Sequence, residues 1–265
     1  MISKALISQI RLLHHKKHRE EQGVFIVEGI KSCMETLQSN WEVIQCFITE
    51  RFDVDSFNAK DTKEMQNTQR MVISEKEMQR ISLLSTAPEI LCIVQTPHYT
   101  LNEFHDKKPL LVLDAIRDPG NLGTIIRTAD WFGFDQILCS EDCVEFTNPK
   151  VIQATMGSFA RVKMVYSDLL DFLKTQQHRT VYGLYMDGEP IQKQLFKNND
   201  IVIIGSESHG ISEMLVPFIQ KEIEISLFPH QGTSPESLNA AIAAGIFMYE
   251  HRKKMKKELL VTRNL

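Results

Sequence analysis

Five candidate strands from Leu110 onward, most of them apolar runs, constrain the fold more than any other feature of the sequence. They are Leu110–Asp114, Gln136–Cys139, Thr180–Tyr185, Ile201–Gly205 and Glu222–Ser226. Helical patterns separate most of them, and nearly continuous apolar character is typical of strands that are covered on both faces. The pattern therefore predicts an α/β fold with a largely parallel sheet.

The first part of the chain contains shorter strands and helices. Strands are expected at Val24–Glu28, Val43–Thr49, Met71–Ser74 and Ile90–Gln95, and helices at Ile30–Leu37 and Glu75–Leu84. This alternation favours a small α/β domain that ends near Gln95, and Pro97 follows in a polar segment. We therefore expect one domain at residues 1–96, a linker at 97–108 and a second domain at 109–265.

Positive charge is concentrated at the two ends of a chain whose formal net charge is −4. Lys16, Lys17 and Arg19 stand near the N-terminus, and six basic residues lie among the last sixteen. A segregated basic patch of this kind is able to bind phosphate groups. The alternative reading, solvated helix faces and a frayed tail, fits the composition equally well.

The cysteines and the apolar segments indicate the compartment. The five cysteines include no C-x-x-C pair, and an odd number cannot close a complete set of disulfides. No apolar run reaches the roughly 20 residues that a membrane span needs, and the N-terminus lacks the apolar core of a secretory signal. We therefore expect reduced core thiols and a cytoplasmic protein without a membrane segment.

A polar loop and a helix follow the run at Leu110–Asp114. Asn121 suits the N-cap of this helix and Gly133 suits the residue after its end. At about 100° per residue, Ile125, Ile126, Ala129 and Phe132 share one side, whereas Arg127, Asp130 and Trp131 fall on the other. Helical geometry alone therefore indicates that Arg127 is a solvated residue.

Two further loops follow predicted strands, and ligands of open parallel sheets bind beyond the carboxyl ends of the strands. Gly205 and Gly210 flank Glu207, whose carboxylate is able to accept hydrogen bonds from a hydroxyl or an amine. The loop lacks the Lys-Ser/Thr of a phosphate-binding P-loop, so a plain turn stays an open alternative.

The third segment leads into a helix of small residues. Thr233 and Glu236 have the spacing of a capping box, and Pro235 suits an early helical turn. Close packing explains the alanines that follow. It does not explain why the polar residues Glu236, Ser237 and Asn239 gather at the mouth of this helix.

The three segments together resemble a known family. Asp118–Ala129, Gly205–Ser212 and Glu236–Ala244 are similar, in order and content, to the three motifs of the SpoU-type (TrmH-like) RNA 2′-O-ribose methyltransferases of the SPOUT superfamily. Asn148–Gly157 resembles the family's connecting segment. At the front, Phe25–Gly29 and Ser85–Pro88 resemble the RNA-binding domain that many members carry.

The resemblance implies a specific fold and assembly. The catalytic domain of the family is an α/β fold with a C-terminal trefoil knot that binds S-adenosylmethionine, although general topology rules argue against knots. A small α/β domain that binds the substrate RNA precedes it here. Family members are homodimers with the active site at the subunit interface, which would supply a partner surface for Arg127.

The resemblance also assigns roles to individual residues. It implies that Gly205, Ile225, Leu227 and Leu238 hold the cofactor. It implies a catalytic set of Asn121, Arg127, Glu207, Ser237 and Asn239. A guanidinium with a pKa above about 12 is a poor base, so we expect Arg127 to bind the phosphate next to the ribose. Lys16, Lys17 and Arg19 are the other expected RNA contacts.

The expected activity is methyl transfer from S-adenosylmethionine to a ribose 2′-hydroxyl of RNA, with ribosomal RNA preferred over transfer RNA. We expect no metal, because His14 and His18 have i, i+4 spacing without a third ligand. A catalytically silent RNA-binding dimer with the same fold is the alternative, although it need not retain the complete catalytic set. A nucleotide-dependent oxidoreductase is disfavoured because no G-x-G-x-x-G follows a strand.

Overall fold

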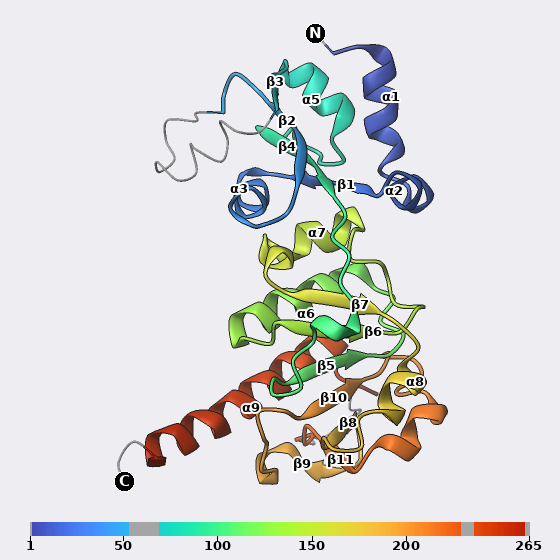
Figure 1. The fold of residues 1–265 in the computed structure, drawn as a ribbon, viewed down its shortest axis with the longest axis vertical. Coiled ribbons are helices and arrows are strands. Elements are labelled where there is room, and N and C mark those ends of the chain that lie inside the picture. Colours follow the sequence, from blue (N-terminus) through green and yellow to red (C-terminus); the bar gives the residue numbers. More distant parts are fainter. Residues whose placement is uncertain (1, 53–68, 229–235, 263–265) are drawn as a thin grey trace. The chain divides into compact units, whose positions relative to one another are not determined.

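The computed structural model describes residues 2–52, 69–228 and 236–262, and the chain forms two compact units (Figure 1). The first unit contains residues 1–98 and 145–161, and the second contains residues 99–144 and 162–265. The domain boundaries expected from the sequence stay a proposal. The structure adds one feature to that proposal. Residues 145–161 follow a strand of the second unit in the sequence but belong to the first unit.

The first unit is a four-stranded mixed sheet with helices around it. The strand order is β1-β4-β2-β3, with β4 antiparallel to both of its neighbours and β2 parallel to β3. The strands are β1 Val24–Glu28, β2 Val43–Ile48, β3 Arg70–Val72 and β4 Ile90–Gln95. The helices are α1 Lys4–Leu12, α2 Lys16–Gln22, α3 Ile30–Gln38, α5 Glu75–Ile81 and α7 Pro149–Thr155. The expected small α/β domain is thus confirmed as a fold.

The second unit contains a seven-stranded sheet of order β7-β6-β5-β10-β8-β11-β9, in which every neighbouring pair is parallel. The strands are β5 Leu110–Leu113, β6 Gln136–Cys139, β7 Lys163–Tyr166, β8 Val181–Tyr185, β9 Glu189–Pro190, β10 Ile201–Ile204 and β11 Lys221–Glu224. The predicted parallel sheet is confirmed. β7 and β9, at the two edges of the sheet, were not expected from the apolar runs.

Both faces of this sheet are covered, as the continuous apolar runs predicted. On one face, Leu110 and Val112 of β5 join a core cluster with the short helix α8 (Leu169–Lys174) and the 3-10 helix η5 (Glu213–Phe218). The alternate residues Leu111 and Leu113 are fully buried as well. Because successive strand residues point to opposite faces, the other face is also packed.

Two long helices of the second unit, α6 (Pro119–Phe132) and α9 (Ala240–Thr262), lie side by side and run in the same direction. A Cβ placed on Gly245 would lie 3.5 Å from Thr128 Cγ2, and further along the rings of Phe132 and Tyr249 are 6.3 Å apart. Arg252 closes the pair, since its Nε donates to Phe132 O at 2.7 Å and its Nη2 donates to Gly133 O at 2.5 Å. Arg252 thereby satisfies carbonyls that the end of α6 leaves open.

In the described part of the chain, no helix is long and apolar enough to cross a membrane, and no group of three or more His, Cys, Asp or Glu is arranged to hold a metal ion. All five cysteines are buried and none forms a disulfide. The expected trefoil knot stays a prediction, because residues 229–235, between β11 and α9, lie outside the described residues.

His251 of α9 gives a prediction about acid stability. Its ring is fully buried among Phe134, Phe196 and Phe247, and its Nε2 donates to Lys197 O at 3.0 Å. Burial lowers the pKa of His251 to about 4, from an ordinary value of 6.5. The unfolded chain therefore binds a proton first, and stability is lost as the pH falls from about 6.5 towards 4.

We predict that His251→Phe removes about 2 kcal/mol of the loss in unfolding free energy that the parent suffers between pH 7 and pH 5. Urea unfolding at the two pH values measures this difference. Asp200→Asn is the matched control, because burial raises the pKa of Asp200 to about 6 and so makes its protonation favour the folded state. Asp200→Asn should therefore lose more unfolding free energy than the parent between pH 7 and pH 5. An acid loss in His251→Phe equal to that of the parent would refute the prediction.

Candidate active site

Three loops of the second unit meet at one edge of the large sheet. They follow β5, β10 and β11, at residues 114–118, 205–210 and 225–228. β5 pairs with β10, and both β10 and β11 pair with β8, all in parallel. The carboxyl ends of these strands therefore lie together, in the position where ligands of open parallel sheets bind.

A compact hydrogen-bond network joins the three sequence motifs at this edge. Glu207 Oε1 accepts from Asn121 Nδ2 at 2.9 Å, from Asn239 Nδ2 at 2.7 Å and from the backbone N–H of Ala240 at 3.0 Å. Asn239 Nδ2 also donates to Asn121 Oδ1 at 2.8 Å. Residues 121, 207 and 239, far apart in sequence, are thus held in one triangle.

The loop after β10 is built to present Glu207. Ser206 and Gly210 exchange backbone hydrogen bonds of 3.1 and 2.9 Å, which closes the loop on itself. A Cβ on Gly205 would lie 2.1 Å from the backbone carbon of Gly210, so only glycine fits at that position. Gly205 therefore has a structural role in shaping the loop, in addition to the expected contact with a cofactor.

The start of α6 corrects one prediction. Asp118, not Asn121, caps this helix, because Asp118 Oδ1 accepts from Asn121 N at 2.7 Å. The side chain of Asn121 is therefore not used in capping and turns to Glu207 instead. Both residues are good caps, and Pro119 settles the choice because proline is favoured in the first helical turn. Gly133 ends the helix in the left-handed region, as expected.

The start of α9 differs from the sequence pattern as well. Asn239 Oδ1 accepts from the backbone N–H groups of Ala241 and Ile242 at 3.0 and 3.2 Å, so α9 begins at Ala240. Thr233 and Pro235, expected in the cap and first turn, lie outside the described residues. Ser237 is exposed before the helix, two residues from Asn239.

Arg127 lies on the outer face of α6, as helical geometry predicted. Its side chain is exposed, and among the residues that the structure describes it makes no hydrogen bond or ion pair. Trp131, one turn further along the same face, is 84% exposed. The network thus stands at the start of α6, and a free guanidinium stands on the face of the same helix.

The residues expected to hold a cofactor present apolar groups at this edge. Leu227 is 58% exposed and Leu238 is 45% exposed, whereas Ile225 is partly buried. Phe228, which the sequence analysis did not single out, is 86% exposed. Apolar side chains that remain open to water beside polar groups fit a ligand with a planar apolar part, such as the adenosine of S-adenosylmethionine.

The basic residues near the N-terminus differ in exposure and in their partners. Lys16 and Lys17 are exposed on α2 and form i, i+4 ion pairs with Glu20 and Glu21. The Arg19 side chain is only 3% exposed and donates to Leu13 O at 2.9 Å. Its guanidinium also forms an ion pair with Glu145 of the same unit. Arg19 therefore holds the first unit together, and an RNA contact would require it to leave these partners.

Sequence reasoning missed Asp114, a buried acid at the end of β5. Its N–H donates to Ile204 O at 2.9 Å, and its Oδ2 accepts from Ser212 N at 2.7 Å. Asp114 therefore ties the loop after β5 to the end of the loop after β10. The position of an acidic residue directly after an apolar strand was the available signal.

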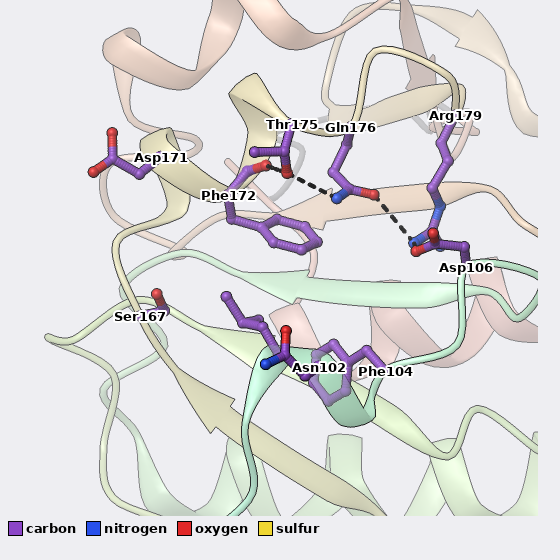
Figure 2. A pocket seen from close by; sticks show the side chains of 10 residues that line it. Asn102, Phe104, Asp106, Ser167, Asp171, Phe172, Thr175, Gln176 and Arg179 are labelled. Carbon is purple, nitrogen blue, oxygen red and sulfur yellow. Dashed lines mark hydrogen bonds and ion pairs between the residues drawn. The ribbon is translucent and has the colours of Figure 1, made fainter.

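A cavity of about 530 Å³ lies in another part of the second unit (Figure 2). It opens between residues 101–106 and α8, and Figure 2 shows Phe172, Gln176 and Arg179 across from Asn102 and Phe104. No residue of the predicted catalytic or cofactor set lines it. Arg179 at its end is occupied by Asn199 O and Lys108 O, at 2.7 and 2.9 Å. The candidate site is therefore the open edge of the sheet.

Comparisons with known proteins agree with this geometry. Residues 108–249 match the model of the SpoU rRNA Methylase family, and residues 4–92 match the MRM3-like substrate binding domain. A 23S rRNA (guanosine-2′-O)-methyltransferase of Bacillus subtilis is 28% identical over 244 residues, which cover 91% of this chain and 93% of the relative.

Solved structures show the same fold over nearly the whole chain. A Porphyromonas gingivalis protein described as an RNA methyltransferase of the TrmH family has 30% identity and a TM-score of 0.81, covering 96% of this chain and 99% of its own. An rRNA methyltransferase of Sinorhizobium meliloti, solved with S-adenosylmethionine bound, has 25% identity and a TM-score of 0.83, with 96% of each chain covered. The matched motifs, the parallel sheet and the family model agree, and the chain belongs to the SpoU rRNA methylase family.

Proposed function

We propose that this protein transfers the methyl group of S-adenosylmethionine to a ribose 2′-hydroxyl of ribosomal or transfer RNA. The observation that carries the proposal is the triangle of Asn121, Glu207 and Asn239 at the carboxyl edge of the sheet, with Arg127 exposed on the same helix as Asn121. A protein that only bound RNA would not require this network. Ribosomal RNA is the preferred substrate class, because the Bacillus subtilis relative is named for 23S rRNA.

The cofactor would lie against the loops after β10 and β11 and the start of α9. When bound, S-adenosylmethionine supplies an electrophilic methyl group on a sulfonium. The exposed side chains of Leu227 and Leu238 would cover its apolar part, and Ile225 would support it from the end of β11. Gly205 would keep the loop after β10 in the shape that leaves this edge open.

Glu207 and its partners would order the reacting groups. Oε1 of Glu207 is occupied by three donors, whereas Oε2 has no partner among the described residues. Oε2 is therefore the oxygen that could accept a hydrogen bond from a ligand hydroxyl or amine. Because both amides are fixed by the network, the carboxylate keeps its direction before substrate arrives, and little reorganisation is needed at the reaction. Ser237 stands at the same mouth.

Arg127 would bind the phosphate next to the target ribose. Its planar guanidinium can hold phosphate through two parallel hydrogen bonds and polarise the neighbouring 2′-hydroxyl. In this proposal the phosphate assists the loss of the hydroxyl proton, and Arg127 positions the nucleophile.

A homodimer would complete the site. The outer surface of the α6 and α9 pair carries exposed apolar side chains: Trp131 at 84%, Ile242 at 51% and Tyr249 at 51%. Tyr249 packs against Phe132 of α6, so α9 presents its exposed groups beside α6, and we infer that the two helices form one surface. Exposed aromatic and aliphatic groups on one face are typical of an interface, and Arg127 lies on that face of α6.

The first unit would choose the RNA. It matches a substrate-binding domain model, and its exposed Lys16 and Lys17 are suited to phosphate contacts that weaken with added salt. We do not assign such a contact to the buried Arg19. The trefoil knot, expected from the family resemblance, and a cytoplasmic location, expected from the cysteines and the apolar segments, are further parts of the proposal.

The activity is tested by incubating the protein with labelled S-adenosylmethionine and total cellular RNA, followed by mapping of alkali-resistant linkages. The proposal expects label in RNA at such linkages. Binding of RNA and of S-adenosylmethionine without any transfer would favour the silent RNA-binding dimer instead.

We predict that Arg127→Lys lowers kcat/KM for methyl transfer on the order of 10²-fold, because a point charge cannot replace two-point positioning of phosphate. Calorimetric affinity for S-adenosylmethionine should stay within about 2-fold of the parent, since Arg127 is not among the residues assigned to the cofactor. Arg80→Lys, an exposed Arg of α5, is the control and should be fully active. Near-normal turnover by Arg127→Lys would refute the positioning role.

We predict that Trp131→Glu makes the protein monomeric, because a carboxylate would lie in the middle of the proposed apolar interface. Light scattering coupled to gel filtration should show half the mass of the parent, and methyl transfer should be lost with the dimer. Leu195→Glu is the matched control, since Leu195 is 81% exposed in the same unit but outside α6 and α9. An unchanged mass for Trp131→Glu would place the interface elsewhere.

A further inference from the structure

The loop between β5 and α6, residues 114–118, is held on both sides. On one side Asp114 joins it to Ile204 and Ser212. On the other side stands a turn directly after β6, whose Ser140, Asp142 and Cys143 we call the clasp. This loop leads into Asn121 and Arg127, so whatever fixes the loop also fixes the two motif residues of α6.

Side chains of the clasp accept hydrogen bonds from the two backbone amides at the bend of the loop. Ser140 Oγ accepts from Ala115 N at 2.9 Å, and Cys143 Sγ accepts from Ile116 N at 3.2 Å. Backbone bonds complete the contact, from Ser140 N to Leu113 O at 2.9 Å and from Val144 N to Ile116 O at 3.0 Å.

The bend that these contacts hold is strained. Ala115 has a φ of 57°, in the left-handed region that residues with a Cβ seldom adopt. Such a conformation is unfavourable for a residue with a Cβ and persists only where the surroundings impose it. Hydrogen bonds to the N–H of Ala115 and of the residue after it are suited to impose this conformation.

The remaining contacts orient the clasp itself. Ser140 Oγ donates to Asp142 Oδ1 at 2.6 Å, which directs its lone pairs towards Ala115 N, and Arg117 pairs with Asp142 Oδ2 at 2.6 Å. Hydrogen bonding to the Cys139 thiol, followed by Ser140 and the N–H of Ile116, lowers the pKa of the Cys143 thiol to about 7, although its burial opposes the shift.

We propose that Ser140 and Cys143 are positioning residues for methyl transfer, which hold loop 114–118 in the bend that places Asn121 in the triangle and Arg127 at the ribose. The proposal rests on the methyltransferase function proposed above. Asp142 has a lesser part, because its pairing with Arg117 is exposed and exposed ion pairs contribute little. The positioning role belongs to Ser140 Oγ and Cys143 Sγ, which accept hydrogen bonds from the two loop amides.

The test measures kcat and KM for methyl transfer to RNA, together with calorimetric affinity for S-adenosylmethionine and the melting temperature. Ser140→Ala and Cys143→Ala should each lower kcat about 10-fold or more, because a small displacement of catalytic groups has a large effect on rate. Cofactor affinity should stay within about 2-fold, since the cofactor residues lie on the loops after β10 and β11 and at the start of α9. The rescue variants Ser140→Thr and Cys143→Ser retain an acceptor and should recover most of kcat.

Ser167 is the matched control. It follows β7 as Ser140 follows β6, and its N–H donates to Cys139 O at 3.1 Å in the same way. Among the described residues its side chain makes no hydrogen bond. Ser167→Ala should therefore have the kcat of the parent.

The outcomes separate the two levels of the proposal. A parent without methyl transfer would refute the proposed function itself. An active parent with fully active Ser140→Ala and Cys143→Ala would refute only the positioning role. A fall in kcat that is matched by equal losses in cofactor affinity and melting temperature, without rescue by the hydroxyl variants, would show a merely structural role and would also refute it.

Discussion

One oxygen atom, Oε1 of Glu207, organises the candidate site. It accepts two side-chain amides and one backbone N–H from segments that begin at residues 121 and 239. Charge-assisted hydrogen bonds of this kind are about twice as strong as neutral ones. The Oδ1 atom of each asparagine accepts a hydrogen bond as well. Asn121 Oδ1 receives Asn239, and Asn239 Oδ1 caps α9. Replacement of one member would remove a restraint on the other two, because each side chain is held partly by the others.

The network is precise because rigid elements carry it. α6 is capped at its start by Asp118 and closed at its end by Arg252, which comes from α9. The two helices are therefore joined at both ends, at the triangle and at the Arg252 contact. Loop 114–118 adds a third restraint through Asp114 and the clasp. A site on helices that are fixed by neighbouring hydrogen bonds needs little ordering when substrate binds.

Much of this arrangement could be predicted from sequence, and the failures have physical causes. Continuous apolar runs such as Ile201–Ile204 fixed the parallel sheet, and the period of α6 placed Arg127 outside. The predicted cap of α6 was wrong because Asp118 and Asn121 are both good caps; Pro119 favours Asp118, and the side chain of Asn121 contacts Glu207 instead. β7 was missed because its run of four mixed residues has no strand signal without its neighbour β6. Burial of Arg19 depends on Glu145, which is 126 residues away.

The contact between Arg252 and α6 has a consequence for biosynthesis. α6 is contacted near its start by Asn239, the residue before α9, and at its end by Arg252 of α9, the last helix of the described chain. When β11 has been synthesised, every described strand of the large sheet has been made, yet Asn121 and Glu207 still lack their third partner, Asn239. Domains generally fold as units while the chain emerges, N-terminal parts first. The methyl-transfer site can therefore be assembled only once α9 has been synthesised, after the strands of both units.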